Sequence, residues 1–281
     1  MVRFAVHRHD VQEKGANGPR RRFAPGKGRF HDMSIIDHTL TDRAPPVLDL
    51  AGTALFLDLD GTLAPIVARP QDVGPDPRRT AILADLVRRM DGRVAILSGR
   101  TLAEIDHILD SAVRPAAAVH GLDRREPDGR HNPPPPHPDL PDVAAAFQDL
   151  AARSPGLLVE TKGLSVALHY RQAPDQAADV LALAQQWSDR TGLKLQPGHM
   201  VVELRTPGPD KGDSLATFMA AAPFKGAIPV FVGDDLTDEP AFRAARDLGG
   251  AGVLVGPRRN SAATHRLEDV SAVLDWLEAA L

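Results

Sequence analysis

The sequence predicts an α/β fold, a doubly wound parallel sheet into which a smaller α+β layer is inserted. Two observations carry this prediction. Short apolar runs without alternation, typical of strands covered on both faces, recur between segments with helical spacing. This alternation then stops at a proline-rich middle segment, after which a helix followed by two short strands occurs twice. A chain of 281 residues has room for both parts.

Five apolar runs are expected to form the strands of the larger sheet. They cover residues 54–57, 93–97, 116–119, 228–232 and 253–255. Helical spacing appears between them, for example over residues 78–90 and 101–109. The last helix is the clearest, because apolar residues recur every three or four positions from Val270 to Leu281. We therefore expect a Rossmann-like core with helices on both faces of the sheet.

The middle of the chain is expected to form the smaller layer. Six prolines between Pro133 and Pro141 indicate a stiff linker. Helices are expected around residues 143–150 and 180–187, and strands at 157–160, 164–170, 193–196 and 200–204, the last two on either side of Pro197-Gly198. We expect residues 133–204 to be an α+β cap that determines substrate specificity. The catalytic core is then formed by residues 46–132 and 205–281.

Composition limits the chemistry that the chain can perform. Cysteine is absent, which excludes disulfides, thiolate catalysis and cysteine-based zinc sites. The formal net charge of -4 favours neither a nucleic acid nor a membrane as partner. No apolar run approaches the roughly 20 residues that span a bilayer. An enzyme built from this chain must use carboxylates, hydroxyls, histidines or lysines.

Residues 1–45 differ from the rest and are expected to be a disordered basic tail. The first 30 residues carry eight Lys or Arg against Asp10 and Glu13, with no sustained apolar periodicity. A solvated extension accounts for this composition more simply than a nucleic-acid-binding arm. The tail has no apolar region of about 7–15 residues, as a signal peptide requires, so we expect a cytoplasmic location.

Polar side chains follow three of the expected core strands. Asp58 and Asp60 follow the first, Ser98 follows the second, and Asp234 and Asp238 follow the fourth. Taken alone, each of these residues is equally well explained as a loop residue that caps the next helix. In an open parallel sheet, however, ligands bind beyond the carboxyl ends of the strands. We therefore expect these side chains to converge on one crevice.

The segment Asp58-Leu59-Asp60-Gly61-Thr62 concentrates the chemistry. A carboxylate that attacks phosphorus forms an aspartyl-phosphate and divides hydrolysis into two easier steps. A second carboxyl group can protonate the leaving alcohol and later activate water. Phosphate beside several carboxylates requires a cation, and magnesium prefers such oxygen ligands. The pattern thus predicts a magnesium-dependent phosphatase.

The motifs resemble those of a known superfamily in their order along the chain. Asp58-x-Asp60-Gly61-Thr62, Ser98, Lys211-Gly212 and Gly233-Asp234-Asp235-x-Thr237-Asp238 are similar to the four motifs of the haloacid dehalogenase (HAD) superfamily. Within it, the chain from about residue 50 onward closely resembles trehalose-6-phosphate phosphatases, for example in Leu97-Ser98-Gly99-Arg100 and in the segment from Ser165 to Arg171. One departure from the family pattern is Asp210, which stands before Lys211 where asparagine is usual.

The resemblance implies a role for each matching residue of the core. Asp58 would be the nucleophile and a metal ligand. Asp60 would be the general acid and base, with its backbone carbonyl on magnesium. Ser98 and Lys211 would hold the phosphoryl oxygens, and Leu59 would lie beside the substrate. The magnesium ligands implied by the resemblance are Asp58, Asp60, Asp234, Asp235 and Asp238.

In the cap, the resemblance implies that three charged residues contact the sugar, namely Glu160, Lys162 and Glu203. The alternative is that they form surface ion pairs of little energetic consequence. Weaker candidates for substrate binding are Arg100, His169 and Arg171, for which a surface or packing role is equally plausible. His120 follows a strand end without a second histidine at ligand spacing, so we expect it to be structural.

The function expected from the resemblance is hydrolysis of trehalose 6-phosphate to trehalose and phosphate, the last step of trehalose biosynthesis. This function would couple the chain to a trehalose-6-phosphate synthase. One alternative is a capped enzyme acting on another sugar phosphate, such as sucrose phosphate, or a mutase. The other is a non-catalytic sugar-phosphate sensor, against which the intact pair Asp58 and Asp60 argues.

Overall fold

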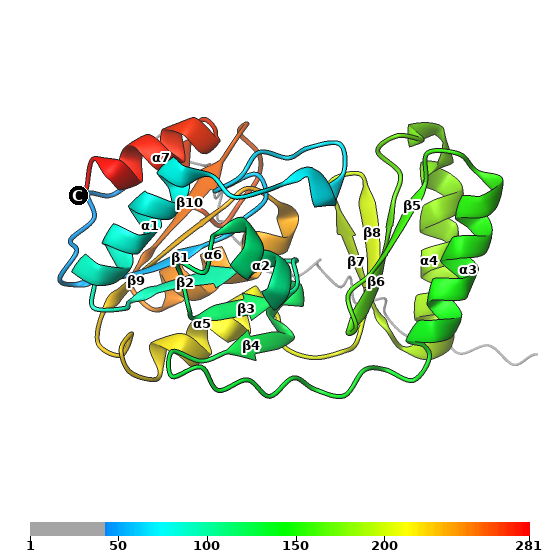
Figure 1. Ribbon diagram of the computed structural model, residues 1–281, viewed down its shortest axis with the longest axis horizontal. Coiled ribbons are helices and arrows are strands. Elements are labelled where there is room, and N and C mark those ends of the chain that lie inside the picture. Colours follow the sequence, from blue (N-terminus) through cyan, green and yellow to red (C-terminus); the bar gives the residue numbers. More distant parts are fainter. Residues whose placement is uncertain (1–42) are drawn as a thin grey trace, which may run out of the picture. The chain divides into compact units, whose positions relative to one another are not determined.

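The computed structural model describes residues 43–281, so the expected tail of residues 1–45 lies outside the described residues except at its last three positions. The described strands form two sheets (Figure 1). The larger sheet has seven strands in the order β11-β10-β9-β1-β2-β3-β4. Its strands are β1 (Thr53–Leu57), β2 (Val94–Leu97), β3 (Ala116–Ala118), β4 (Asp123–Arg125), β9 (Ile228–Gly233), β10 (Ala251–Val255) and β11 (His265–Leu267). All neighbours are parallel except β3 and β4.

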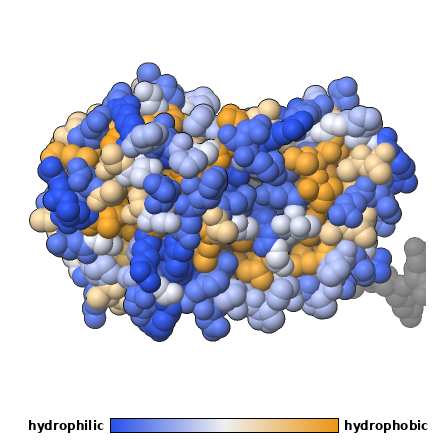
Figure 2. All heavy atoms as spheres, viewed as in Figure 1, coloured by the Kyte–Doolittle hydropathy of each residue, from blue (hydrophilic) through white to orange (hydrophobic). Residues whose placement is uncertain are grey.

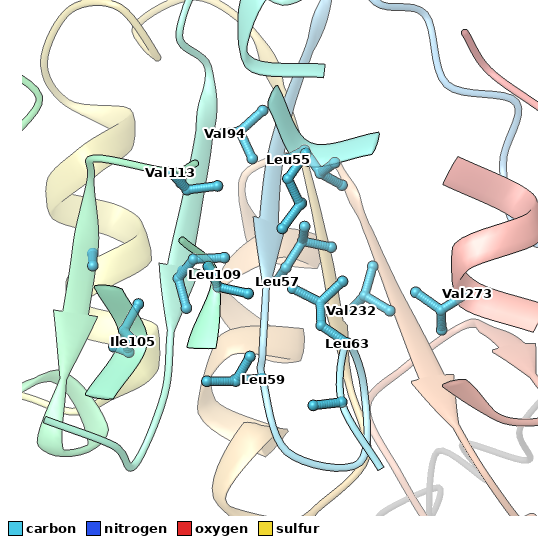
Figure 3. Close-up of a cluster of buried hydrophobic side chains, with 14 of the residues drawn as sticks. Leu55, Leu57, Leu59, Leu63, Val94, Ile105, Leu109, Val113, Val232 and Val273 are labelled. Carbon is cyan, nitrogen blue, oxygen red and sulfur yellow. The ribbon is translucent and has the colours of Figure 1, made fainter. Parts of the chain in front are cut away.

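Helices cover both faces of this sheet, as the apolar runs predict. One face carries α1 (Pro77–Arg89), α2 (Leu102–Ile108) and α7 (Val270–Glu278), and the other carries α5 (Lys211–Met219) and α6 (Glu239–Asp247). Successive side chains of a strand point to opposite faces. Leu55 and Leu57 of β1 accordingly pack in the first cluster, shown in Figure 3, and Phe56 packs in the second. The prediction of a doubly wound α/β core is confirmed.

The smaller sheet contains β5 (Leu158–Thr161), β6 (Ser165–His169), β7 (Lys194–Gly198) and β8 (Val201–Arg205). Its order is β5-β6-β8-β7, and all its neighbours are antiparallel. One face is covered by α3 (Leu140–Arg153) and α4 (Ala177–Thr191), seen beside the sheet in Figure 1. Because strand side chains alternate, the other face presents a second set of residues, which belongs to the site described below.

The structure differs from the expected elements mainly at strand edges. The strands β4 and β11 were not expected, because each is only three residues long, mostly polar and half-buried at a sheet edge. Pro197 and Gly198 lie within β7 rather than in the turn after it. Since β7 is an edge strand, the missing N–H of Pro197 removes no bond that the sheet needs. Helix α3 begins at Leu140, with Pro141 in its first turn, where proline is well tolerated.

The strand order places the expected polar residues close together. From β1 the chain proceeds to β2 and β3 on one side, whereas β9 pairs with β1 on the other side and leads to β10. This change of direction between β1 and β9 is the position at which such sheets bind ligands. None of the helices in residues 43–281 is long and apolar enough to cross a membrane.

Candidate active site

The site is built where β1 and β9 end. Asp58 follows β1 directly and is 5% exposed, and its backbone N–H donates to Val232 of β9. The buried Nζ atom of Lys211 donates to Oδ1 of Asp58 at 2.7 Å and to Oδ1 of Asp238 at 2.6 Å. One ammonium group therefore joins the carboxylates that follow the two central strands.

Lys211 has this position because it opens helix α5. Asp210 is the N-cap residue of the helix, and its carboxylate accepts from the backbone N–H groups of Gly212 and Asp213 at 2.9 and 3.1 Å. Aspartate and asparagine cap helices about equally well. The departure from asparagine noted in the sequence thus keeps the capping function at this position.

Three carboxylates of the site form a cluster that fits a metal ion. Asp58, Asp234 and Asp238 each place an oxygen within 4.8 Å of the others. Oδ1 of Asp234 is buried and has no hydrogen-bond partner, an arrangement that costs free energy unless a cation or donor is supplied. Gly61, at a φ of 80°, makes room for this carboxylate, because a Cβ atom there would lie 2.1 Å from Oδ2 of Asp234. Oxygen ligands of this kind suit magnesium.

The crowding of these acids raises the pKa values of two of them. Burial raises the pKa of Asp58 to about 7, an effect that the neighbouring Lys211 partly opposes. Burial and the charges of Asp58 and Asp238 raise the pKa of Asp234 to about 9. Burial alone would lower the pKa of Lys211, but Asp238 and Asp58 raise it above its ordinary value. The cluster therefore carries one permanent cation and an excess of carboxylates.

Asp60, the expected general acid and base, is held by Arg100. The Nε and Nη2 atoms of Arg100 donate to the two carboxylate oxygens of Asp60 at 2.8 and 2.7 Å. Arg100 also donates to the backbone carbonyl of Pro70 at 2.8 Å. Such a bidentate pair fixes the plane of the carboxylate. Arg100 therefore orients Asp60, and it is a buried residue of the site rather than a surface residue.

Ser98 and Leu59 occupy different environments although both were expected to lie near the substrate. Ser98 is buried after β2, and the cap of the following helix is Thr101, so helix capping does not explain Ser98. The side chain of Leu59 is fully buried in the apolar core, as Figure 3 shows. Any contact of Leu59 with a ligand is therefore limited to its backbone.

On the smaller sheet, strand register aligns the charged residues. Glu160 of β5 lies opposite Ala167 of β6, and Ala167 lies opposite Glu203 of β8. Gln196 of β7 completes the row opposite Glu203. This row is on the face that α3 and α4 do not cover.

Lys162 joins the two glutamates and connects them to the core. Its Nζ atom lies 3.1 Å from Oε2 of Glu203 and 3.8 Å from Oε2 of Glu160, and it donates to the carbonyl of Gly99 at 3.0 Å. The three charged side chains are only 5–11% exposed, so they are not surface ion pairs. Burial opposes the charge of Glu203, but Lys162 and His120 lower its pKa well below the ordinary value.

His169 and Arg171 extend this polar wall. Nε2 of His169 lies 2.8 Å from Oε2 of Glu160. Arg171 donates to the carbonyl of Val67 in the core at 2.9 Å and to that of His199 at 3.1 Å. Arg171 thus contacts both layers at the edge of the site.

His120 is closer to the site than the sequence indicated. Val119, His120 and Gly121 all have positive φ, a costly conformation for a β-branched valine. This turn places the imidazole against Gly99, with Nε2 3.4 Å from Oε2 of Glu203, and burial lowers the pKa of His120. The backbone strain, which no sequence pattern reveals, is what directs this side chain toward the cap.

Almost all of the site residues expected from the sequence line one pocket. In the part of the chain that the structure describes, its lining includes Asp58, Asp60, Ser98, Arg100, Glu160, Lys162, His169, Arg171, Glu203, Lys211, Asp234 and Asp235. Asp238 lies beneath it, fully buried. Figure 2 shows hydrophilic residues gathered in the hollow between the two layers. The pocket therefore faces carboxylates on one side and a polar wall on the other.

Fold and site together define the class of the protein. The doubly wound core has paired aspartates after its first strand, a lysine at the start of α5 and further aspartates after β9, and it is joined to an α+β cap; this is the HAD-like architecture that the sequence predicts. A solved HAD-superfamily phosphatase from Bacteroides thetaiotaomicron aligns with a TM-score of 0.54 at 17% identity, covering 84% of this chain and 97% of that one, which supports the fold.

The chain belongs to the trehalose-phosphatase family, whose sequence profile matches residues 56–271. The trehalose-6-phosphate phosphatase of Escherichia coli (strain K12) is 40% identical over 230 residues, or 80% of this chain and 85% of that protein. A solved trehalose-6-phosphate phosphatase related protein aligns with a TM-score of 0.67 at 26% identity, covering 80% of this chain and 95% of the other. This chain is therefore a phosphoric monoester hydrolase.

Proposed function

We propose that the chain hydrolyses trehalose 6-phosphate to trehalose and phosphate through an aspartyl-phosphate on Asp58. The observation that supports this substrate most strongly is the buried row of Glu160, Lys162 and Glu203, which faces the catalytic carboxylates across one pocket. Carboxylates accept from hydroxyl groups and an ammonium group donates to them. The row thus suits the distal glucose of a disaccharide phosphate whose phosphate lies at Asp58.

In the first step of the proposed reaction, a carboxylate oxygen of Asp58 attacks phosphorus. The bond between phosphorus and the sugar oxygen breaks, and Asp60 gives its proton to that oxygen, which leaves as the alcohol of trehalose. Lys211 and Ser98 hold the oxygens of the phosphoryl group, whose charge must be offset in the transition state. Arg100 keeps Asp60 oriented toward the leaving oxygen.

In the second step, water attacks the phosphorus of the aspartyl-phosphate. Asp60 takes a proton from that water, the bond between phosphorus and the Asp58 oxygen breaks, and phosphate is released. We propose that magnesium is held by Asp58 and Asp234, with Asp60 contributing its backbone carbonyl and Asp235 or Asp238 acting directly or through water. When bound, the ion would supply positive charge to the phosphoryl oxygens.

The proposal is tested by phosphate release from a panel of substrates, with magnesium and with excess chelator. We expect trehalose 6-phosphate to be hydrolysed much faster than sucrose 6-phosphate or glucose 6-phosphate. A site built for hydrogen bonds rejects a ligand that leaves its buried polar groups unpaired, as glucose 6-phosphate would. Chelator should remove the activity and magnesium should restore it.

Other outcomes of the panel would distinguish the alternatives. Preference for another disaccharide phosphate would identify a different sugar-phosphate phosphatase. Binding of sugar phosphates without phosphate release would indicate a sensor. Full activity in excess chelator would contradict the magnesium-dependent mechanism. The cytoplasmic location and the coupling to a synthase stay predictions.

A further inference from the structure

The loop after β9, residues 234–238, is held from its inner side by one of its own carboxylates. Oδ2 of Asp238 accepts from the backbone N–H groups of Asp234 and Asp235 at 2.9 and 3.0 Å. Oδ1 of the same carboxylate accepts from Lys211. Since Asp238 is fully buried, these bonds are shielded from water and fix the N–H side of two peptide groups.

Arg259 holds the same loop from its outer side. Its Nη2 atom donates to the backbone carbonyl of Asp235 at 2.8 Å and lies 3.4 Å from that of Asp234. Arg259 comes from the segment after β10, and its side chain is 23% exposed. The two residues whose N–H groups bond Asp238 therefore have their carbonyl groups bonded to Arg259.

The guanidinium group of Arg259 is itself anchored. Its Nη1 atom forms an ion pair with Glu239, which is the first residue of α6 and is 15% exposed. The second carboxylate oxygen of Glu239 accepts from the backbone N–H of Ala262 at 2.8 Å. A carboxylate at the start of a helix is also stabilised by the helix dipole. Glu239 thus connects the segment of Arg259 to the helix that follows the acidic loop.

We propose that Arg259 is a positioning residue that sets the cation affinity of the acidic loop. The inference rests on the proposed cation-dependent reaction. Asp234 has both its N–H and its carbonyl bonded, so the direction of its Cα–Cβ bond is fixed, and the carboxylate with the unpartnered Oδ1 moves only by rotation of the side chain. A cation site that is organised in advance loses less entropy on binding. Without Arg259, the peptide group between Asp234 and Asp235 is held by Asp238 alone and the carbonyl of Asp235 loses its partner, so the backbone that carries the carboxylate of Asp234 is held less firmly.

Arginine is required at this position because of its shape. The planar fork of its guanidinium reaches the carbonyls on one side and Glu239 on the other, whereas a lysine ammonium is a compact charge on a flexible stem. We therefore expect Arg259→Lys to retain only part of the effect. Arg246, in the last turn of α6, is a matched control. Its ion pair with the adjacent Asp247 is exposed and involves no residue of the loop 234–238.

The experiment measures the dissociation constant for magnesium by calorimetry in the full chain and in Arg259→Ala, Arg259→Lys and Arg246→Ala. We expect affinity to weaken about tenfold in Arg259→Ala, less in Arg259→Lys, and not at all in Arg246→Ala. At saturating magnesium, Arg259→Ala should hydrolyse p-nitrophenyl phosphate at most of the rate of the parent chain. The rise in melting temperature on adding magnesium should be smallest in Arg259→Ala, intermediate in Arg259→Lys and unchanged in Arg246→Ala.

The outcomes separate this inference from the proposed function. If the parent chain releases phosphate but Arg259→Ala binds magnesium as tightly as the parent, the inference about Arg259 is wrong and the proposed function stands. A parent chain that binds no magnesium would overturn both. If Arg259→Ala does not fold, Glu239→Gln replaces it, because loss of the anchoring charge should weaken magnesium binding in the same direction. Unchanged affinity in that variant would equally overturn the inference.

Discussion

At the scale of a single residue, the contacts of the buried Asp58 act on its pKa in opposite directions. Its burial favours the neutral acid, the ion pair with Lys211 favours the carboxylate, and the other acids of the cluster oppose it. A nucleophile must be ionised, and the net effect of these contacts is a pKa of about 7 without a cation. Binding of a cation at the cluster favours the ionised, reactive form.

We expect Asp58→Asn to abolish turnover while leaving the fold intact. An amide is a poor nucleophile and a poor metal ligand, and the substitution is nearly isosteric. It also removes one of the crowded carboxylates, so the melting temperature without metal should not fall. Steady-state kinetics and thermal unfolding check both expectations. Activity within tenfold of the parent would contradict the role of Asp58.

The raised pKa values of Asp58 and Asp234 predict a pH dependence of magnesium binding. Both acids keep their protons in the folded, metal-free protein up to about pH 7 and 9, whereas in the unfolded chain they lose them near pH 4. The unfolded state therefore binds fewer protons in this window, so these groups lower the stability of the metal-free protein as pH rises. Magnesium needs the deprotonated carboxylates, so its affinity should rise over the same window.

Thermal unfolding with magnesium and with chelator, at several pH values from about 6 to 9, tests this dependence. The two melting temperatures should separate progressively as pH rises, because magnesium binds only the native cluster. Asp58→Asn is the control and should show a smaller separation at every pH. A separation that is independent of pH would show that the cluster is already ionised.

At the scale of elements, strand register in the cap brings the sugar-contacting candidates together. Glu160 and Glu203 are 43 positions apart in the chain, but each is a register partner of Ala167. Because side chains alternate along a strand, a shift of one position would turn either glutamate toward α3 and α4. The pairing of β5, β6 and β8 is therefore what makes a polar wall from separate segments.

We expect Glu203→Ala to reduce hydrolysis of trehalose 6-phosphate at least tenfold more than hydrolysis of p-nitrophenyl phosphate. The first substrate needs the cap and the second reaches only the core, so the ratio of the two kcat/KM values reports sugar recognition. Asp179→Asn, an exposed acid on α4, is the control and should change neither rate. Equal losses of kcat/KM on both substrates would mean that Glu203 does not recognise the sugar.

At the scale of the whole molecule, the basic N-terminal segment contributes no motif to the site. Deletion of residues 1–32 should leave kcat and KM for trehalose 6-phosphate within about twofold of the parent. All residues of the candidate site lie between Asp58 and Arg259, and the family profile matches only residues 56–271. A large fall in activity of a truncated chain with an unchanged melting temperature would show that the segment takes part in the reaction.

The sequence by itself determined the class of fold and the chemical groups of the core site. Unbroken apolar runs that alternate with helical segments are typical of strands covered on both faces, and polar residues directly after such strands are expected at the carboxyl edge of the sheet. That reasoning is local, so it identified Asp58, Asp60, Ser98 and Asp234 without coordinates. It failed for β4 and β11, because strands of three mostly polar residues carry no periodic signal.

Only the tertiary structure decided which groups contact one another. The bond from Lys211 to Asp238, the bidentate pair of Arg100 with Asp60 and the bonds of Arg259 to the acidic loop join residues 24 to 40 positions apart. Such contacts depend on the packing of helices and on loop conformation, including the strained turn at His120. Local sequence patterns report burial and periodicity, but not which distant segments meet, because that is set by the packing of the whole chain.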